Sequence, residues 1–153
     1  MAHYYMEHHS DESFLVYRED VLLLTVHRRR GWDTVLRSEY FLGEKRIMAA
    51  SLSEFLWSWR LKITFLDPAY SIAREGNGVG KFRVPEGVIE VKHAVLRNPV
   101  RTFWLNGEKM GFADMNMRKS FAPFEYQLEL SGSPELEMYF LLAMILSEPD
   151  MTT

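Results

Sequence analysis

The feature that most constrains the fold is a run of nine apolar residues near the end of the chain, residues 138–146. Ser133 before this run is a good N-cap, and Pro134 suits the first helical position. Glu135 and Glu137 place negative charge at the positive end of the helix dipole. The sequence therefore predicts a helix that is apolar on every side from residue 138 and ends at Ser147. Such a helix must be surrounded by protein, and it is too short to cross a bilayer.

The residues before this helix are typical of short β-strands joined by turns. The clearest hairpin is centred on Asn106-Gly107, because both residues accept the positive φ of a type I′ turn. In that hairpin Phe103 is expected opposite Met110, and Trp104 opposite Lys109. The predicted strands are residues 13–18, 21–27, 34–42, 46–51, 55–65, 70–74, 79–84, 88–95, 101–105, 108–114 and 124–130. Residues 3–7 would add a twelfth strand, and residues 46–51 could instead begin a helix.

The strand expected at residues 55–65 has the longest apolar alternation in the chain. Strict period two over eleven residues is a strong strand signal. Its aromatic face is predicted to be buried, and the opposite face, which carries Arg60 and Lys62, is predicted to be partly wet. The alternating apolar residues are Phe55, Trp57, Trp59, Leu61, Ile63 and Phe65.

These elements predict a mainly β fold: an antiparallel barrel of about 11–12 strands that encloses the C-terminal apolar helix. A flat sheet would cover only one side of the helix, whereas a barrel covers every side and leaves few unpaired edges. The alternative is a β-sandwich or α+β domain whose last helix lies in a dimer interface. We expect residues 1–153 to form a single domain, with residues 1–12 either flexible or a marginal first strand.

The order of these parts resembles the tubby C-terminal-domain-like fold of tubby proteins, phospholipid scramblases and LURP-one-related proteins. Residues 104–112 look like that superfamily's hairpin of apolar residues around Asn/Asp-Gly, and residues 126–130 followed by 136–146 look like its closing strand and central helix. The calcium-loop pattern and membrane segment of scramblases have no counterpart in this sequence. The resemblance implies a non-enzymatic module, which in tubby itself binds phosphoinositides through basic surface residues.

One dense basic cluster suggests a ligand site. Guanidinium groups bind phosphate in a bidentate manner, and a tryptophan can lie at the level of lipid headgroups. The cluster is expected to form a turn at residues 28–32, joined by cations from adjacent strands. The alternative is a solvated turn that offsets nearby Glu19, Asp20 and Asp33. The candidate ligand-binding residues are Arg28, Arg29, Arg30, Trp32, Arg37, Lys45 and Arg46.

Other motifs indicate ordinary structure, so no metal site and no cofactor is predicted. Residues 76–81 lack the first glycine and the final Ser or Thr of a phosphate loop, and we expect a turn there. Glu90 and His93 would point to opposite faces of a strand. His3, His8 and His9 are expected in a flexible tail.

The composition and net charge leave three classes of function open. A net charge of −3 gives no general attraction to nucleic acid, and the absence of cysteine fits a reducing compartment. With no apolar signal core in the first nine residues, we expect a cytoplasmic protein, monomeric or homodimeric, with an anionic lipid surface as its candidate partner. We predict a non-catalytic binding module. The alternatives are a hydrolase whose site forms only in the fold, beside His27 or His93, and a structural or oligomerisation protein.

Overall fold

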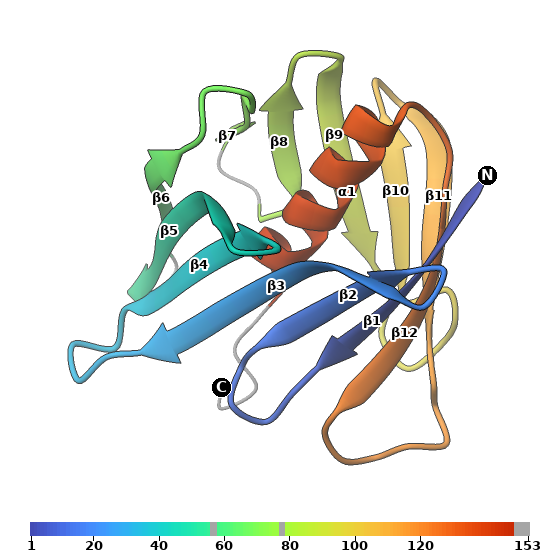
Figure 1. The fold of residues 1–153 in the computed structure, drawn as a ribbon, viewed down its shortest axis with the longest axis horizontal. Coiled ribbons are helices and arrows are strands. Elements are labelled where there is room, and N and C mark those ends of the chain that lie inside the picture. Colours follow the sequence, from blue (N-terminus) through green and yellow to red (C-terminus); the bar gives the residue numbers. More distant parts are fainter. Residues whose placement is uncertain (56–57, 77–78, 149–153) are drawn as a thin grey trace.

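The computed structural model describes residues 1–55, 58–76 and 79–148, which form twelve antiparallel strands and one helix (Figure 1). The strands of the first half are β1 (Ala2–His8), β2 (Phe14–Arg18), β3 (Val21–Arg30), β4 (Leu36–Leu42), β5 (Lys45–Phe55) and β6 (Ser58–Leu66). The second half contains β7 (Ala73–Arg74), β8 (Lys81–Val84), β9 (Gly87–His93), β10 (Arg101–Leu105), β11 (Glu108–Met115), β12 (Phe124–Leu130) and the helix α1 (Pro134–Ser147).

All twelve strands belong to one sheet that curls into a nearly closed barrel. Its order is β6-β5-β4-β3-β2-β1-β12-β11-β10-β9-β8-β7, so each half of the chain forms a meander and the pairing of β1 with β12 joins the halves. The outermost strands are β6 and β7. Arg74 of β7 donates a hydrogen bond to the backbone oxygen of Trp59 in β6 (2.6 Å) and lies over the Trp59 ring. A charged side chain therefore links the two outermost strands.

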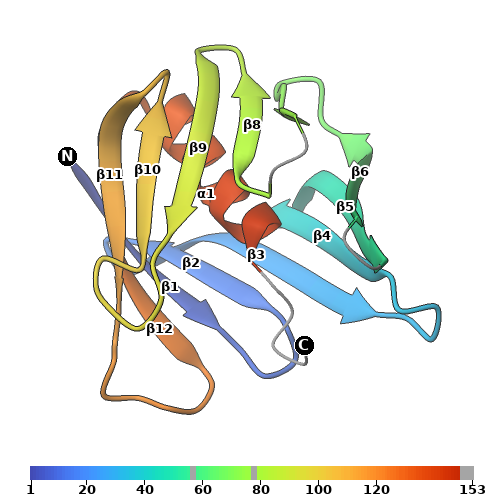
Figure 2. The same cartoon turned by 180° about the vertical axis from the view of Figure 1, so that it is seen from behind.

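The helix α1 lies inside this barrel, as the apolar run predicts (Figures 1 and 2). Eleven of its 14 residues are buried. Ser133 caps it by accepting a hydrogen bond from the backbone N–H of Leu136, and Phe140 packs against Phe103 of β10. The predicted fold class, a mainly β barrel with a C-terminal apolar helix, is therefore confirmed. Kinship with tubby-like proteins stays a prediction. Among the described residues, no helix has the length and apolarity to span a membrane.

The N-terminal residues form a full strand, so the expectation of a flexible tail is wrong and the twelve-strand alternative is correct. Strand β1 pairs along its length with β12 and on its other side with β2. Tyr4, Met6 and His8 point into the core. Burial of alternate side chains fixes this segment in the middle of the sheet.

The long alternation at residues 55–65 is split between two strands. Strand β5 ends at Phe55 and β6 begins at Ser58, and Trp57 lies outside the described residues. The pairing of β5 with β6 shifts between Ala49 and Ala50, because β6 has an extra residue opposite this step. Phe65, expected in the core, is instead exposed on the outer face, where its ring lies under the Arg46 guanidinium. The extra residue, Thr64, lies in β6 itself, and the sequence alternation does not reveal it because a bulge depends on the match with the neighbouring strand.

The hairpin at Asn106-Gly107 forms as predicted, with Trp104 opposite Lys109. A bulge then brings Gly111, and not Met110, opposite the buried Phe103. At Gly111 a β-carbon would lie only 2.2 Å from the backbone oxygen of Glu129 in β12. The close approach of β12 therefore requires glycine at this position.

Candidate functional site

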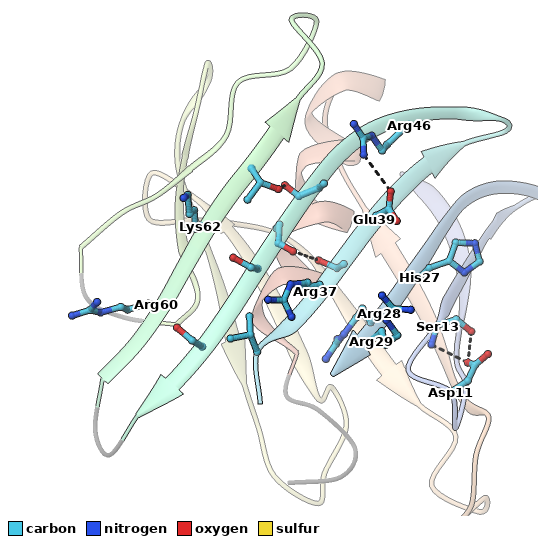
Figure 3. Close-up of a pocket in the computed structure, with 17 residues that line it drawn as sticks. Asp11, Ser13, His27, Arg28, Arg29, Arg37, Glu39, Arg46, Arg60 and Lys62 are labelled. Carbon is cyan, nitrogen blue, oxygen red and sulfur yellow. Dashed lines mark hydrogen bonds and ion pairs between the residues drawn. The ribbon is translucent and has the colours of Figure 1, made fainter. Parts of the chain in front are cut away.

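A large hollow lies on the outer face of β3, β4, β5 and β6, with a volume of about 1010 Å³ (Figure 3). We call it the outer concavity. Its floor carries short side chains, including Ala49, Ser51 and Ser53 of β5. Longer side chains of β3, β4 and β6 stand around this floor. The cationic lining residues are Arg28, Arg29, Arg37, Arg46, Arg60 and Lys62, and the acidic ones are Asp11 and Glu39.

Strand register places the cations in a row across the concavity. Arg29 of β3 pairs with Arg37 of β4, Arg37 pairs with Ser51 of β5, and Ser51 pairs with Lys62 of β6. One step further along the same face, Ser53 pairs with Arg60. Residues in register on one face of a sheet are close neighbours. The sheet therefore gathers four cations around two serine hydroxyls.

Two exposed cations of the concavity have carboxylate partners. The Arg37 guanidinium donates two hydrogen bonds to Asp33, of 3.1 and 2.8 Å, and this interaction lowers the pKa of Asp33 to about 2. Arg46 donates to Glu39 at 3.3 Å while its guanidinium stacks 4.4 Å from the centre of the Phe65 ring. Both side chains are held in place, so they form preorganised parts of the rim.

Three other cations have no carboxylate partner within the part of the chain that the structure describes. They are Arg29 on β3 and Arg60 and Lys62 on β6, all exposed. Arg29 also faces Arg37 directly, and like charges opposite each other in a sheet are destabilising. The concavity therefore has uncompensated positive charge available for an anion.

Arg28 differs from its neighbours because its side chain points inward. Strand β3 continues to Arg30, so residues 28–30 form the end of a strand and not the predicted turn. Arg28 is only 5% exposed, packs over the Phe14 ring, and lies 3.6 Å from a carboxylate oxygen of Glu12. Its Nη2 also donates to the backbone oxygen of Glu148 (3.4 Å). At the base of the concavity, Arg28 thus reaches from the sheet to the end of α1.

The Glu148 carboxylate belongs to the same buried cluster. Arg101 contacts it at 2.6 Å from β10. Burial raises the pKa of Glu148, and the neighbouring Arg101 and Arg28 oppose that rise. The cluster fastens the C-terminal end of α1 to both halves of the barrel.

The remaining predicted site residues lie away from the concavity. Arg30 donates a hydrogen bond to the backbone oxygen of Thr34, within the β3–β4 connection. Trp32 projects from that connection and is 98% exposed. Lys45 pairs with Asp67 (3.1 Å) at the start of β5. Of the seven predicted residues, Arg28, Arg29, Arg37 and Arg46 line the concavity.

Arg60, Lys62, Ser51 and Ser53 line the concavity but are absent from the predicted set. A signal for the first two was present in the sequence, because they alternate with the apolar residues of β6 and must face outward. Their link to Arg29 requires the order and register of β3 to β6. Register across four strands is a property of the fold, and one chain segment does not encode it.

No protein-family model, curated protein or solved structure matches this chain. The geometry of its own residues is therefore the basis for assigning a function.

Proposed function

We propose that this protein is a non-catalytic binding module that holds a phosphate-bearing ligand in the outer concavity. The observation that carries the proposal is the row of Arg29, Arg37 and Lys62 across the Ser51 hydroxyl. Guanidinium and ammonium groups form strong charge-assisted hydrogen bonds with phosphate oxygens. A serine hydroxyl between them supplies a further donor.

An anion at this position would also relieve repulsion. Arg29 and Arg37 face each other in register, and Asp33 compensates only Arg37. Lys62 and Arg60 extend the positive charge across β6. A ligand with more than one phosphate group fits a site whose cations are spread over four strands, because several groups can be contacted at once.

The hydrolase alternative has weaker support. His27 lines the concavity and is in register with Glu39, as an acid-base pair would require. However, Glu39 is engaged by Arg46, and the His27 ring packs edge-on against Phe41. The concavity is wide and open, which suits binding of a multiply charged group. The barrel with its central helix also supports the proposed tubby-like kinship, although a fold alone does not assign function.

The test is a titration of the folded protein with inorganic pyrophosphate. Calorimetry measures the affinity, and amide chemical shifts locate the binding site. The double variant Arg29→Ala, Lys62→Ala should bind about tenfold or more weakly, because a hydrogen bond to a charged group contributes about 1.5–3 kcal/mol. The matched control is Arg83→Ala on β8, an exposed arginine that pairs with Glu75 outside the concavity. Shifts in the wild type should concentrate on β3 to β6 and weaken with added salt.

A second arm separates a soluble ligand from a lipid headgroup. Vesicles of phosphatidylcholine with 30% phosphatidylinositol phosphate would replace pyrophosphate, and binding to vesicles alone would identify a headgroup as the ligand. If the double variant binds pyrophosphate and vesicles as tightly as the wild type does, the concavity is not the binding site.

A further inference from the structure

The antiparallel order places alternate strand connections at the same end of the barrel. The connections β1–β2, β3–β4, β9–β10 and β11–β12 all lie at the end where α1 finishes, since Arg101 at the start of β10 contacts Glu148 and Phe124 at the start of β12 pairs with His8. In Figures 1 and 2 the β9–β10 and β11–β12 connections both lie at the lower side of the barrel. We call residues 94–100 and 116–123 the two docking loops.

The docking loops are next to each other. The Asn98 side chain, in the first loop, accepts a hydrogen bond from the Met115 N–H (2.8 Å) and donates one to the Met115 oxygen (3.0 Å). Met115 directly precedes the second loop. These two bonds fix the first loop beside the base of the second.

Large apolar side chains project from both loops into solvent. Val95 is 81% exposed, Leu96 90% and Phe121 69%, and Met117 is also exposed. Leu96 has a φ of 60°, a left-handed conformation that costs energy for a leucine and suits Gly or Asn better. Neither packing nor backbone geometry therefore explains an apolar side chain at this site.

Both loops carry only positive charge. The charged residues in them are Arg97, Arg118 and Lys119, and their sequences contain no aspartate or glutamate. The Lys119 ammonium lies 5.8 Å from the centre of the Phe121 ring. Apolar tips flanked by cations match the layers of an anionic membrane surface, where apolar side chains enter the acyl boundary and cations stay among the headgroups.

We propose that the two docking loops insert into the surface of an anionic membrane. The charge pattern favours a membrane over a protein partner, because apolar side chains at separate loop tips can each enter a bilayer. A stable protein interface needs a continuous surface of roughly 800 Å² per partner. The inference concerns a surface distinct from the outer concavity, and it holds whether or not the concavity binds phosphate.

The experiment is sedimentation of the full chain with vesicles of phosphatidylcholine containing 30% phosphatidylserine. The double variant Leu96→Ser, Phe121→Ser should lower the partition coefficient about tenfold or more. Replacing Arg118 and Lys119 by glutamine should lower it about fivefold per charge, and added salt should reduce that effect. The matched control is Val21→Ser, Leu22→Ser, an exposed apolar pair at the β2–β3 turn on the opposite end of the barrel.

A direct readout of insertion uses the absence of cysteine from the sequence. An environment-sensitive fluorophore attached to Ser120→Cys should shift to the blue on binding vesicles, whereas the same label on Glu108→Cys, at the opposite end, should not. The variant Arg29→Ala, Lys62→Ala separates the two proposals, because it should impair pyrophosphate binding and leave the fluorophore shift intact. Unchanged sedimentation of the loop variants, or equal loss in the Val21 and Leu22 control, would overturn membrane docking.

Discussion

Residues 28 and 29 show how opposite roles arise at neighbouring positions of one strand. Successive side chains of a strand point to opposite faces. Arg28 is therefore buried beside Phe14, Glu12 and the end of α1, whereas Arg29 is exposed in the outer concavity. The Arg28 Nε and Nη1 atoms are buried without a hydrogen-bond acceptor among the described residues. Arg28 thus has a structural role that its neighbour does not share.

This difference gives a stability prediction. Arg28→Ala removes a buried cation and leaves the carboxylates of Glu12 and Glu148 less compensated, so it should lower the free energy of unfolding by about 3–5 kcal/mol. Arg29→Ala should change it by less than about 0.5 kcal/mol, since it alters an exposed position. Urea unfolding of both variants measures the two effects. Similar free energies for the two variants would contradict the assignment of Arg28 to the core.

At the scale of single residues, the sequence shows where the charges are but not which face of the sheet each charged side chain points to. The run at residues 28–30 correctly draws attention to this part of the chain, but its residues predict a turn, and a turn would expose all three side chains. Only the strand assignment separates Arg28 from Arg29 and brings Arg37 beside Arg29. Arg60 and Lys62 complete the concavity from a strand about thirty residues away, which no local pattern links to β3.

At the scale of elements, α1 is the part of the fold that the sequence predicts best. Its apolarity on all sides, its Ser133 cap and its end at Ser147 are all readable from local residues. The number of strands and their sequence along the chain are predicted, because turn residues separate them. Their bulges at Ala49 and Phe103 are not predicted, since a bulge depends on the match between two neighbouring strands.

The cap of α1 can be tested directly. Ser133→Ala removes the side-chain acceptor for the Leu136 N–H (3.2 Å) and should lower the free energy of unfolding by about 1 kcal/mol. Ser133→Asp keeps an acceptor at the same position and should retain most of the stability. Denaturant unfolding compares the variants. A loss with Asp as large as the loss with Ala would show that Ser133 stabilises the helix by some other means.

At the scale of the whole molecule, the barrel consists of two meanders. They are joined by β1–β12 pairing in the middle of the sheet, and the outermost strands β6 and β7 nearly close it. The pairing of β1 with β12 joins the first and last strands, so the two strands that are most distant in the sequence are hydrogen-bonded neighbours. The outermost strands β6 and β7 meet differently, through the Arg74 side chain on the Trp59 backbone and ring. The concavity lies on the β6 side of this seam, so its shape depends on how firmly the seam is held.

Arg74→Ala should therefore open the barrel locally at the seam. Loss of a hydrogen bond from a charged donor weakens local stability by about 1.5–3 kcal/mol, which corresponds to roughly tenfold or faster amide hydrogen exchange in β6. Amides of β1 and β12, at the centre of the sheet, should exchange at the wild-type rate. Arg83→Ala, which breaks only an exposed pair with Glu75, provides the control. Equal acceleration in every strand would indicate global destabilisation, and unchanged exchange in β6 would show that Arg74 does not hold the seam.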